Sequence, residues 1–191
     1  MGSEMCIRDR SKVNYVHNAS EDVTVIRVQG PAPSVEARSI ALRNLFSGFG
    51  DMEELHSHNS NVLWTEIAEV VDLINDPTKL LWRLSVPPKE GANIANSIRE
   101  FSEADIYFDW GGGLIWVGLS PVTGALSEEI RSLISDIGGH ATLMRAPNDI
   151  RSITPVFQPQ KPGVAALSAR IKQNFDPQGI LNPGKILLAG L

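Results

Sequence analysis

The residues best suited to ligand chemistry stand near the C-terminus, in two turns that follow each other directly. Asp176–Pro177–Gln178–Gly179 has the residue order of a type I turn, and Asn182–Pro183–Gly184–Lys185 has that of a type II turn. Together they predict a rigid loop that presents the Asn182 amide, free backbone N–H groups and the Lys185 ammonium. The alternative is a structural staple, in which the apolar residues between the two turns hold the tail on the domain.

Two further side chains are candidates for work on a substrate. Arg83 lies within a strictly alternating segment, on the face opposite Leu80, Trp82, Leu84 and Val86. Its guanidinium can bind a carboxylate through two parallel hydrogen bonds, or it can be a solvated or ion-paired strand arginine. His140 follows two glycines, and an imidazole transfers protons near neutral pH. The alternative for His140 is a capping or packing role at a helix–strand junction.

Aromatic and metal chemistry give weaker signals. Trp110 and Gly111 begin a Trp-Gly-Gly-Gly turn, which can place the edge of the indole beside a ligand. The alternative is that Trp110 is a core residue and that the glycines only allow the chain to reverse. His56 and His58 would share one face if their segment is a strand, but no third ligand stands at a useful spacing. We therefore expect exposed histidines and no metal. The single cysteine, Cys6, excludes an intrachain disulfide framework.

Hydropathy periods indicate the elements that must position these residues. Period-two or β-branched stretches predict strands, and apolar residues spaced by three and four predict helices. The expected strands are 23–28, 52–58, 80–86, 105–110, 114–119 and 140–145; the expected helices are 34–46, 63–74, 94–101, 126–137 and 164–174. This order predicts an α+β fold, with a ferredoxin-like antiparallel sheet, helices mainly on one face, and a C-terminal helix with a turn-rich tail.

Composition narrows the function classes. The chain has 191 residues and a net charge of −5, with lysine and arginine scattered, so no basic field attracts nucleic acid. No apolar stretch approaches the roughly 18 residues of a membrane span. No glycine-rich loop opens a helix after a strand, so neither a dinucleotide-binding nor a P-loop site is expected. A reducing, cytoplasmic setting is the expectation.

Residues 1–12 are a special case. The first ten contain no apolar block for a signal peptide and no helix or strand periodicity, so we interpret residues 1–12 as a non-native or sequence-assembly segment and leave them out of the fold prediction. Residues 13–191 are then the folded domain. The same interpretation predicts that the natural protein begins further upstream.

Four motifs together resemble one protein family. The segment NFDPQGILNPGKI is similar to the C-terminal end of FAD-linked oxidases of the vanillyl-alcohol oxidase superfamily. Leu81–Pro87, Asp109–Gly112 and Gly138–Thr142, in that order and spacing, narrow the resemblance to E-type FAD-binding subunits of glycolate oxidase. The tail motif is shared by the wider superfamily, whereas the combination is more specific. The resemblance runs from about Val23 to the C-terminus.

The resemblance implies the C-terminal cap domain of a flavoprotein. Its N-terminal FAD-binding domain, which would hold most of the FAD, has no counterpart in this chain, so the fragment alone is expected to be inactive. The implied function is the oxidation of a 2-hydroxy acid such as glycolate, with hydride passing from the substrate α-carbon to FAD. The implied catalytic residues are His140 and Arg83; the implied cofactor-binding residues are Asn182, Gly184, Lys185, Trp110 and Gly111.

The resemblance also implies partners. They are a paired flavin subunit, which the resemblance implies as the place of the principal chemistry, and an iron–sulfur subunit that receives electrons, with no nucleic acid and no transmembrane segment. Through this complex the expected location is the cytoplasm or the periphery of the inner membrane. The alternative class is a non-catalytic ferredoxin-like interaction or ligand-sensing module. Flavin retention by a chain extended upstream distinguishes the two.

Overall fold

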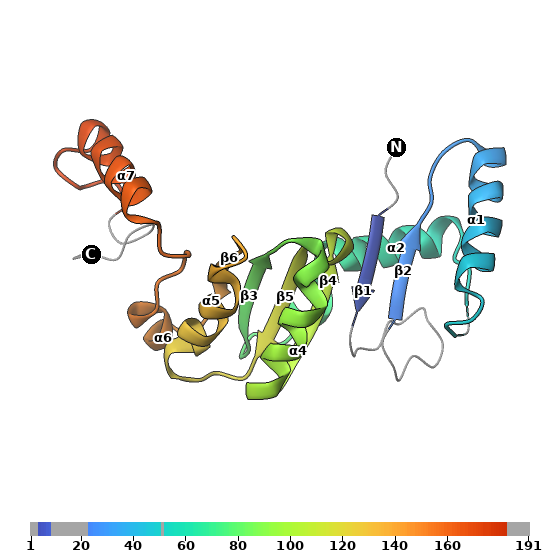
Figure 1. Cartoon of the computed structure of the whole chain (residues 1–191), viewed down its shortest axis with the longest axis horizontal. Helices are drawn as coiled ribbons and strands as arrows, with labels where there is room; N and C mark the ends of the chain where they lie inside the picture. The colour runs from blue at the N-terminus through green and yellow to red at the C-terminus, as the bar shows by residue number, and fades with distance from the viewer. Residues whose placement is uncertain (1–3, 9–22, 51, 183–191) are drawn as a thin grey trace.

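A four-stranded antiparallel unit forms the centre of the protein in a computed structural model that describes residues 4–8, 23–50 and 52–182. Strands β3 (Leu80–Ser85), β4 (Ala104–Asp109), β5 (Leu114–Leu119) and β6 (His140–Arg145) alternate with helices α4 (Gly91–Phe101) and α5 (Ser127–Ser135). Their order in the sheet is β4-β5-β3-β6, and every neighbouring pair is antiparallel. This arrangement is the split βαβ topology of ferredoxin-like domains, so the predicted α+β class is confirmed (Figure 1).

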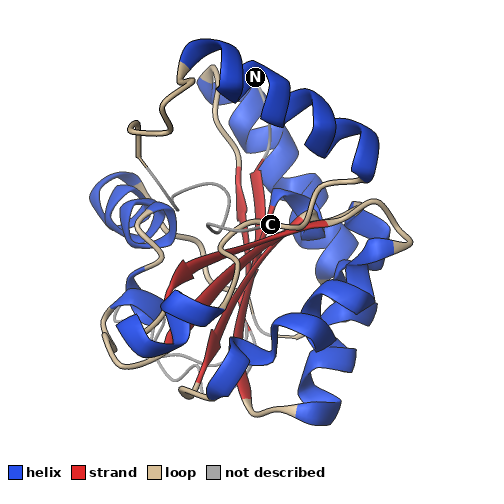
Figure 2. Ribbon diagram, turned by 90° about the vertical axis from the view of Figure 1, so that its left-hand side faces the viewer, coloured by secondary structure: helices blue, strands red, loops and turns tan. Residues whose placement is uncertain are grey.

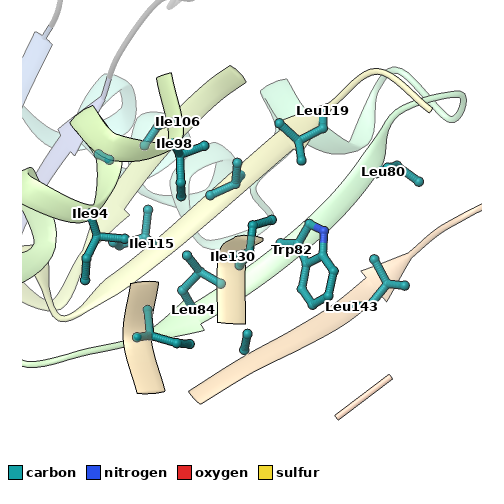
Figure 3. Packing of buried hydrophobic residues seen from close by; sticks show 14 of the residues in the cluster. Leu80, Trp82, Leu84, Ile94, Ile98, Ile106, Ile115, Leu119, Ile130 and Leu143 are labelled. Carbon is teal, nitrogen blue, oxygen red and sulfur yellow. The ribbon is translucent and has the colours of Figure 1, made fainter. Parts of the chain in front are cut away.

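Helices α4 and α5 cover one face of this unit, and the main core lies between them and the sheet. Period-two alternation turns Leu80, Trp82 and Leu84 of β3 toward the helices, where all three are fully buried. Ile115 and Val117 of β5, Ile98 of α4 and Ile130 of α5 complete the packing (Figure 3). Trp82 also donates from Nε1 to the Ala125 carbonyl at 3.0 Å, so its one polar atom is satisfied.

Helices α2 (Ser57–Ala68) and α3 (Val71–Ile74) pack on the opposite face, so the sheet has helices on both sides (Figure 2). Their apolar side chains contact Leu81 and Tyr107, and Tyr107 donates to the Ile67 carbonyl at 3.3 Å. The expected strand 52–58 is wrong: residues 52–56 form no regular element, and α2 begins at Ser57. The expected helix 63–74 is interrupted because Val70 has a left-handed backbone, with φ of 53°.

The sheet extends beyond β4 through β1 (Glu4–Arg8) and then β2 (Val23–Arg27), which gives six strands in all. β2 leads into α1 (Ala32–Phe46), where Pro31 and Pro33 bracket the start. The strand β1 corrects the expectation that the first residues have no strand, because its backbone pairs with both β2 and β4. Backbone pairing requires no hydropathy period, and the origin of residues 1–12 stays a prediction.

The C-terminal part leaves the sheet edge and ends in a separate helix. Val156 accepts a hydrogen bond from the Leu143 N–H at 2.8 Å, which ties the chain after α6 (Asn148–Ile153) to β6. Arg131 holds the same stretch by donating to the carbonyls of Pro155 and Phe157, and burial lowers the pKa of its guanidinium. Helix α7 (Pro162–Phe175) then lies apart from the sheet, with no buried residue (Figure 1).

Arg145 at the end of β6 fastens the α3–β3 connection. Its guanidinium donates to four backbone carbonyls, those of Leu73, Ile74, Asp76 and Lys79, at 2.6–3.1 Å. These carbonyls stand at a chain reversal, where no helix or strand satisfies them. Arg145 therefore replaces the regular hydrogen bonding that this connection lacks.

Arg145→Ala is expected to lower the free energy of unfolding by about 1–2 kcal/mol, because four backbone carbonyls, three of them in partly buried hydrogen bonds, lose a charged donor. Chemical denaturation measures the loss. Arg145→Lys is expected to recover little, since a single ammonium cannot reach all four carbonyls. The matched control is Arg151→Ala on an exposed turn of α6. Equal losses for Arg145→Ala and Arg151→Ala would contradict the assigned role.

Candidate functional site

A patch of polar side chains lies on the face of the sheet that carries α2 and α3, at the end those helices leave uncovered. It consists of Arg83 and Ser85 on β3 and of Thr142 and His140 on β6, and we call it the polar face. Arg83 pairs with Thr142, and Ser85 with His140, so all four project to the same side. None of them is buried. The predicted orientation of Arg83, opposite to Leu80, Trp82 and Leu84, is confirmed.

Arg83 lies between two indole rings. Its guanidinium carbon is 5.3 Å from the centre of the Trp110 ring and 5.9 Å from that of Trp116, within the range of cation–π attraction. Trp116 is also the strand partner of Arg83 on β5. It packs against the apolar cluster that α2 and α3 form with Leu81 and Tyr107. Within the described part of the chain, no carboxylate pairs with Arg83. Its N–H donors are therefore open to a ligand.

The turn between β4 and β5 brings Trp110 to this place. Trp110 is 59% exposed, so its alternative role as a core residue is wrong. Its backbone is left-handed, with φ of 53°, which is unfavourable for a bulky residue. Asp109 compensates: its Oδ1 accepts the Trp110 N–H at 2.6 Å. Gly111 also has a positive φ, of 61°, and a side chain there would meet open space.

The rest of that turn packs directly against the backbone at the start of α4 and just before it. A Cβ on Gly112 would lie 2.9 Å from the Pro88 carbonyl oxygen, and one on Gly91 would lie 2.3 Å from the Gly112 oxygen. Glycine at both positions allows the two backbones to touch. The turn that carries Trp110 is thereby fixed against the core unit.

His140 begins β6 and is exposed, so it is not a packing histidine. It lies two residues from Thr142 on the same strand face, which makes it the diagonal neighbour of Arg83 across the β3–β6 pair. Such neighbours have Cα atoms roughly 7–8 Å apart, a separation that one small ligand can bridge. The structure thus brings Arg83, Trp110 and His140 to one surface.

The tail residues lie elsewhere. The type I turn is present, with the Gly179 N–H bound to the Asp176 carbonyl at 3.1 Å, while Ile180 and Leu181 are 69% and 58% exposed. The staple alternative is therefore wrong for these two side chains. Asn182 is exposed on the arm formed by α7 and this turn, not on the polar face. Gly184 and Lys185 lie outside the described residues.

Asp176 organises the tail turn and is 7% exposed. Its carboxylate accepts Lys172 Nζ at 2.7 Å and the N–H groups of Ile180 and Leu181 at 3.0 Å each. The hydrogen bond from Lys172, helped by those from the two amides, lowers the pKa of this carboxyl below its ordinary value.

This pKa shift predicts that the turn is sensitive to acid. A lowered pKa means that the charged carboxylate stabilises the turn at any pH above the ordinary carboxyl value, and that this stabilisation is lost as pH falls through the lowered value. We expect the Ile180 and Leu181 amide resonances to hold their positions near neutral pH and to shift toward unstructured values in strong acid. Asp176→Asn should give the shifted positions at neutral pH. Amide resonances that do not respond to either change would contradict the role of Asp176.

The candidate histidine pair, His56 and His58, lies at the start of α2. His56 precedes α2 and His58 lies within it, so the two do not share a strand face. No group of three or more metal-ligating side chains occurs in the part of the chain that the structure describes. No helix there is long and apolar enough to cross a membrane.

Sequence reasoning gave no site role to four residues of this surface, Ser85, Asp109, Trp116 and Thr142, although all but Trp116 stand within the motifs that carry the family resemblance. Trp116 and Thr142 reach Arg83 only through the register of strands distant in sequence, so no local signal places them beside it. Asp109 could have been found, because an aspartate directly before a Trp-Gly-Gly turn is a common capping residue.

The C-terminal arm carries a recognised family signature. Residues 158–186 match the family described as FAD linked oxidases, C-terminal domain. This range includes α7 and the Asp176 turn. The predicted resemblance to FAD-linked oxidases is confirmed by this match.

A relative among characterised proteins agrees with the family match. The chain is 26% identical over 161 residues to glycolate oxidase subunit GlcE of Escherichia coli (strain K12), an alignment that covers 84% of this chain and 38% of that protein. The chain thus spans well under half of the relative's length. Together the two findings support a C-terminal FAD-oxidase domain of the GlcE type, and they indicate FAD as the cofactor.

Proposed function

We propose that this domain forms the substrate side of a flavin-dependent 2-hydroxy-acid oxidoreductase of the glycolate oxidase type, with Arg83 and His140 at the site of reaction. The observation that carries the proposal is the environment of the Arg83 guanidinium. It is a partly buried residue whose guanidinium carbon lies 5.3 Å and 5.9 Å from the centres of two indole rings, with no carboxylate partner in the described chain. An arginine held in this way is suited to the planar carboxylate of a small acid.

The β4–β5 turn, which lies beside the polar face, has room for a flavin ring. Trp110 and Gly111 would hold the edge of the planar ring, because the indole is exposed and no atom lies within 4 Å of the position that a Gly111 Cβ would occupy. FAD, when bound, supplies the acceptor for the hydride from the substrate α-carbon. Asn182, with Gly184 and Lys185, is proposed to contact the cofactor from the C-terminal arm.

The two reacting roles follow from the chemistry of the side chains. Arg83 binds the substrate carboxylate with two N–H donors and so orients the α-carbon. His140 accepts the hydroxyl proton through its imidazole as the hydride leaves the α-carbon. The substrate then becomes a 2-oxo acid, having lost one hydride and one proton. Trp110 and Trp116 shield the guanidinium from water and limit its motion.

The relative is named as a subunit, so the proposal extends to an assembly. We propose that the complete protein works beside a paired flavin subunit and an iron–sulfur subunit, which receive the electrons. In this proposal it is the accessory flavoprotein of that complex, and the paired subunit performs the principal turnover.

Flavin retention tests the proposal. The reading frame that encodes this chain, with its upstream sequence, is expressed and the purified protein is examined by absorption spectroscopy. We expect flavin bands that bleach under anaerobic conditions on addition of glycolate. A protein that neither retains FAD nor captures a partner subunit would contradict the proposal and favour a ligand-sensing or interaction module.

A further inference from the structure

The contact between Arg83 and Trp110 depends on a backbone conformation that tryptophan does not favour. At φ of 53° the Trp110 Cβ crowds the neighbouring carbonyl, and a free chain would leave this state. The indole lies against Arg83 in this conformation, with its ring centre 5.3 Å from the guanidinium carbon. Whatever holds the Trp110 backbone therefore also determines where the guanidinium can lie.

Asp109 is the side chain that holds it. Its own backbone is extended and ends β4, and its Oδ1 accepts the Trp110 N–H at 2.6 Å. A carboxylate acceptor makes this hydrogen bond stronger than a neutral one. The Gly113 N–H closes the turn onto the Trp110 carbonyl at 3.2 Å, so both backbone groups of Trp110 are occupied.

We propose that Asp109 is a positioning residue, which fixes Arg83 on the polar face by locking the turn conformation that places Trp110 against it. The proposal rests on the proposed function for its purpose, since a fixed guanidinium binds a carboxylate without first being ordered. Its structural content is independent of that function. Among the described residues, the Asp109 carboxylate is hydrogen-bonded to the Trp110 N–H and to no atom of Arg83, so in this proposal it acts through Trp110.

The test uses the Arg83 side-chain Nε–H resonance in ¹⁵N-labelled protein of the full chain. Arg83→Lys assigns the resonance by its disappearance. Two indole rings near the guanidinium are expected to move it away from the position of mobile arginines. In Asp109→Ala we expect it to return toward that position, whereas Asp109→Asn should largely keep it, because an amide oxygen still accepts the Trp110 N–H.

Two matched variants separate positioning from general damage. Glu100→Gln removes the same charge from an exposed helical site and should leave the Arg83 resonance unchanged. Trp110→Gly tolerates the positive φ but lacks the indole, so it should lose the part of the shift that Trp110 causes while remaining folded, with Trp116 still beside Arg83. Because Asp109 acts through Trp110, Asp109→Ala should have no additional effect in the Trp110→Gly background.

Acetate, the simplest carboxylate, is the probe for ligand binding. We expect Asp109→Ala to weaken its binding by about 3- to 10-fold, from the lost order of one long side chain. An Arg83 resonance that is the same in Asp109→Ala and wild type would overturn the positioning role. If instead the resonance moves as expected but wild type shows no acetate binding, positioning is upheld and the proposed carboxylate site fails.

Discussion

Replacing Arg83 by methionine is expected to lower kcat/KM for a 2-hydroxy acid about 100-fold in the flavin-loaded protein that contains this domain. A hydrogen bond to a charged group contributes about 1.5–3 kcal/mol, and two such bonds to one carboxylate, with partial compensation by water, leave roughly 3 kcal/mol to lose. Methionine keeps much of the length of the side chain between Trp110 and Trp116. The decrease in kcat/KM therefore measures the loss of the guanidinium N–H donors rather than a loss of packing.

Two comparisons sharpen this result. Arg83→Lys keeps the charge but not the planar fork, and should lose about 10-fold. Arg151→Met, on an exposed turn of α6, removes an equal charge far from the polar face and should leave kcat/KM unchanged. If the carboxylate is held equally in the ground and transition states, the Arg83 effect falls on KM. Wild-type kcat/KM in Arg83→Met would show that another group binds the carboxylate.

The central unit could be predicted because its signals are local. The alternation in Leu80–Val86 fixes which residues of β3 enter the core, and that alone sends Arg83 to the other face. Antiparallel strands with one covered face show this period most clearly, and α2 and α3 leave the Arg83 end of β3 uncovered. The triple glycine is also a local signal, and it marks the β4–β5 reversal. Glycine adopts positive φ readily, as Gly111 and Gly112 do here.

The site itself could be predicted only in part, because its composition depends on register. Arg83 and Trp110 were recognisable by type, yet Trp116 and Thr142 join them through pairings between strands about 30 and 60 residues apart in sequence. The misplaced strand 52–58 has a related cause. Its short apolar positions suit either period; residues 52–56 form no regular element, and α2, which packs against Tyr107 and Leu81, begins only at Ser57.

Gly91→Ala is expected to reduce the free energy of unfolding by about 3 kcal/mol, the upper end of the usual cost of overpacking. The added methyl group would lie 2.3 Å from the Gly112 carbonyl oxygen, which is backbone and cannot rotate away. Either α4 or the Trp110 turn must move. Chemical denaturation measures the stability, and near-UV circular dichroism reports any rearrangement of the indoles.

Gly163→Ala provides the matched control, since Gly163 also stands at the start of a helix, α7, but has no atom within 4 Å of its Cβ position. Alanine there should stabilise by about 0.5–1 kcal/mol, through its better helix propensity. Glycine to alanine is thus expected to change the free energy of unfolding in opposite directions at the two helix starts. The difference between the two values measures the cost of the contact between the Gly91 position and the Trp110 turn. If Gly91→Ala also weakens acetate binding while Gly163→Ala does not, the turn transmits core packing to the polar face. Equal stability changes at the two positions would show that the turn yields freely, and the hydrogen bonds that Trp110 makes with Asp109 and Gly113 would then restrain its backbone without help from Gly91.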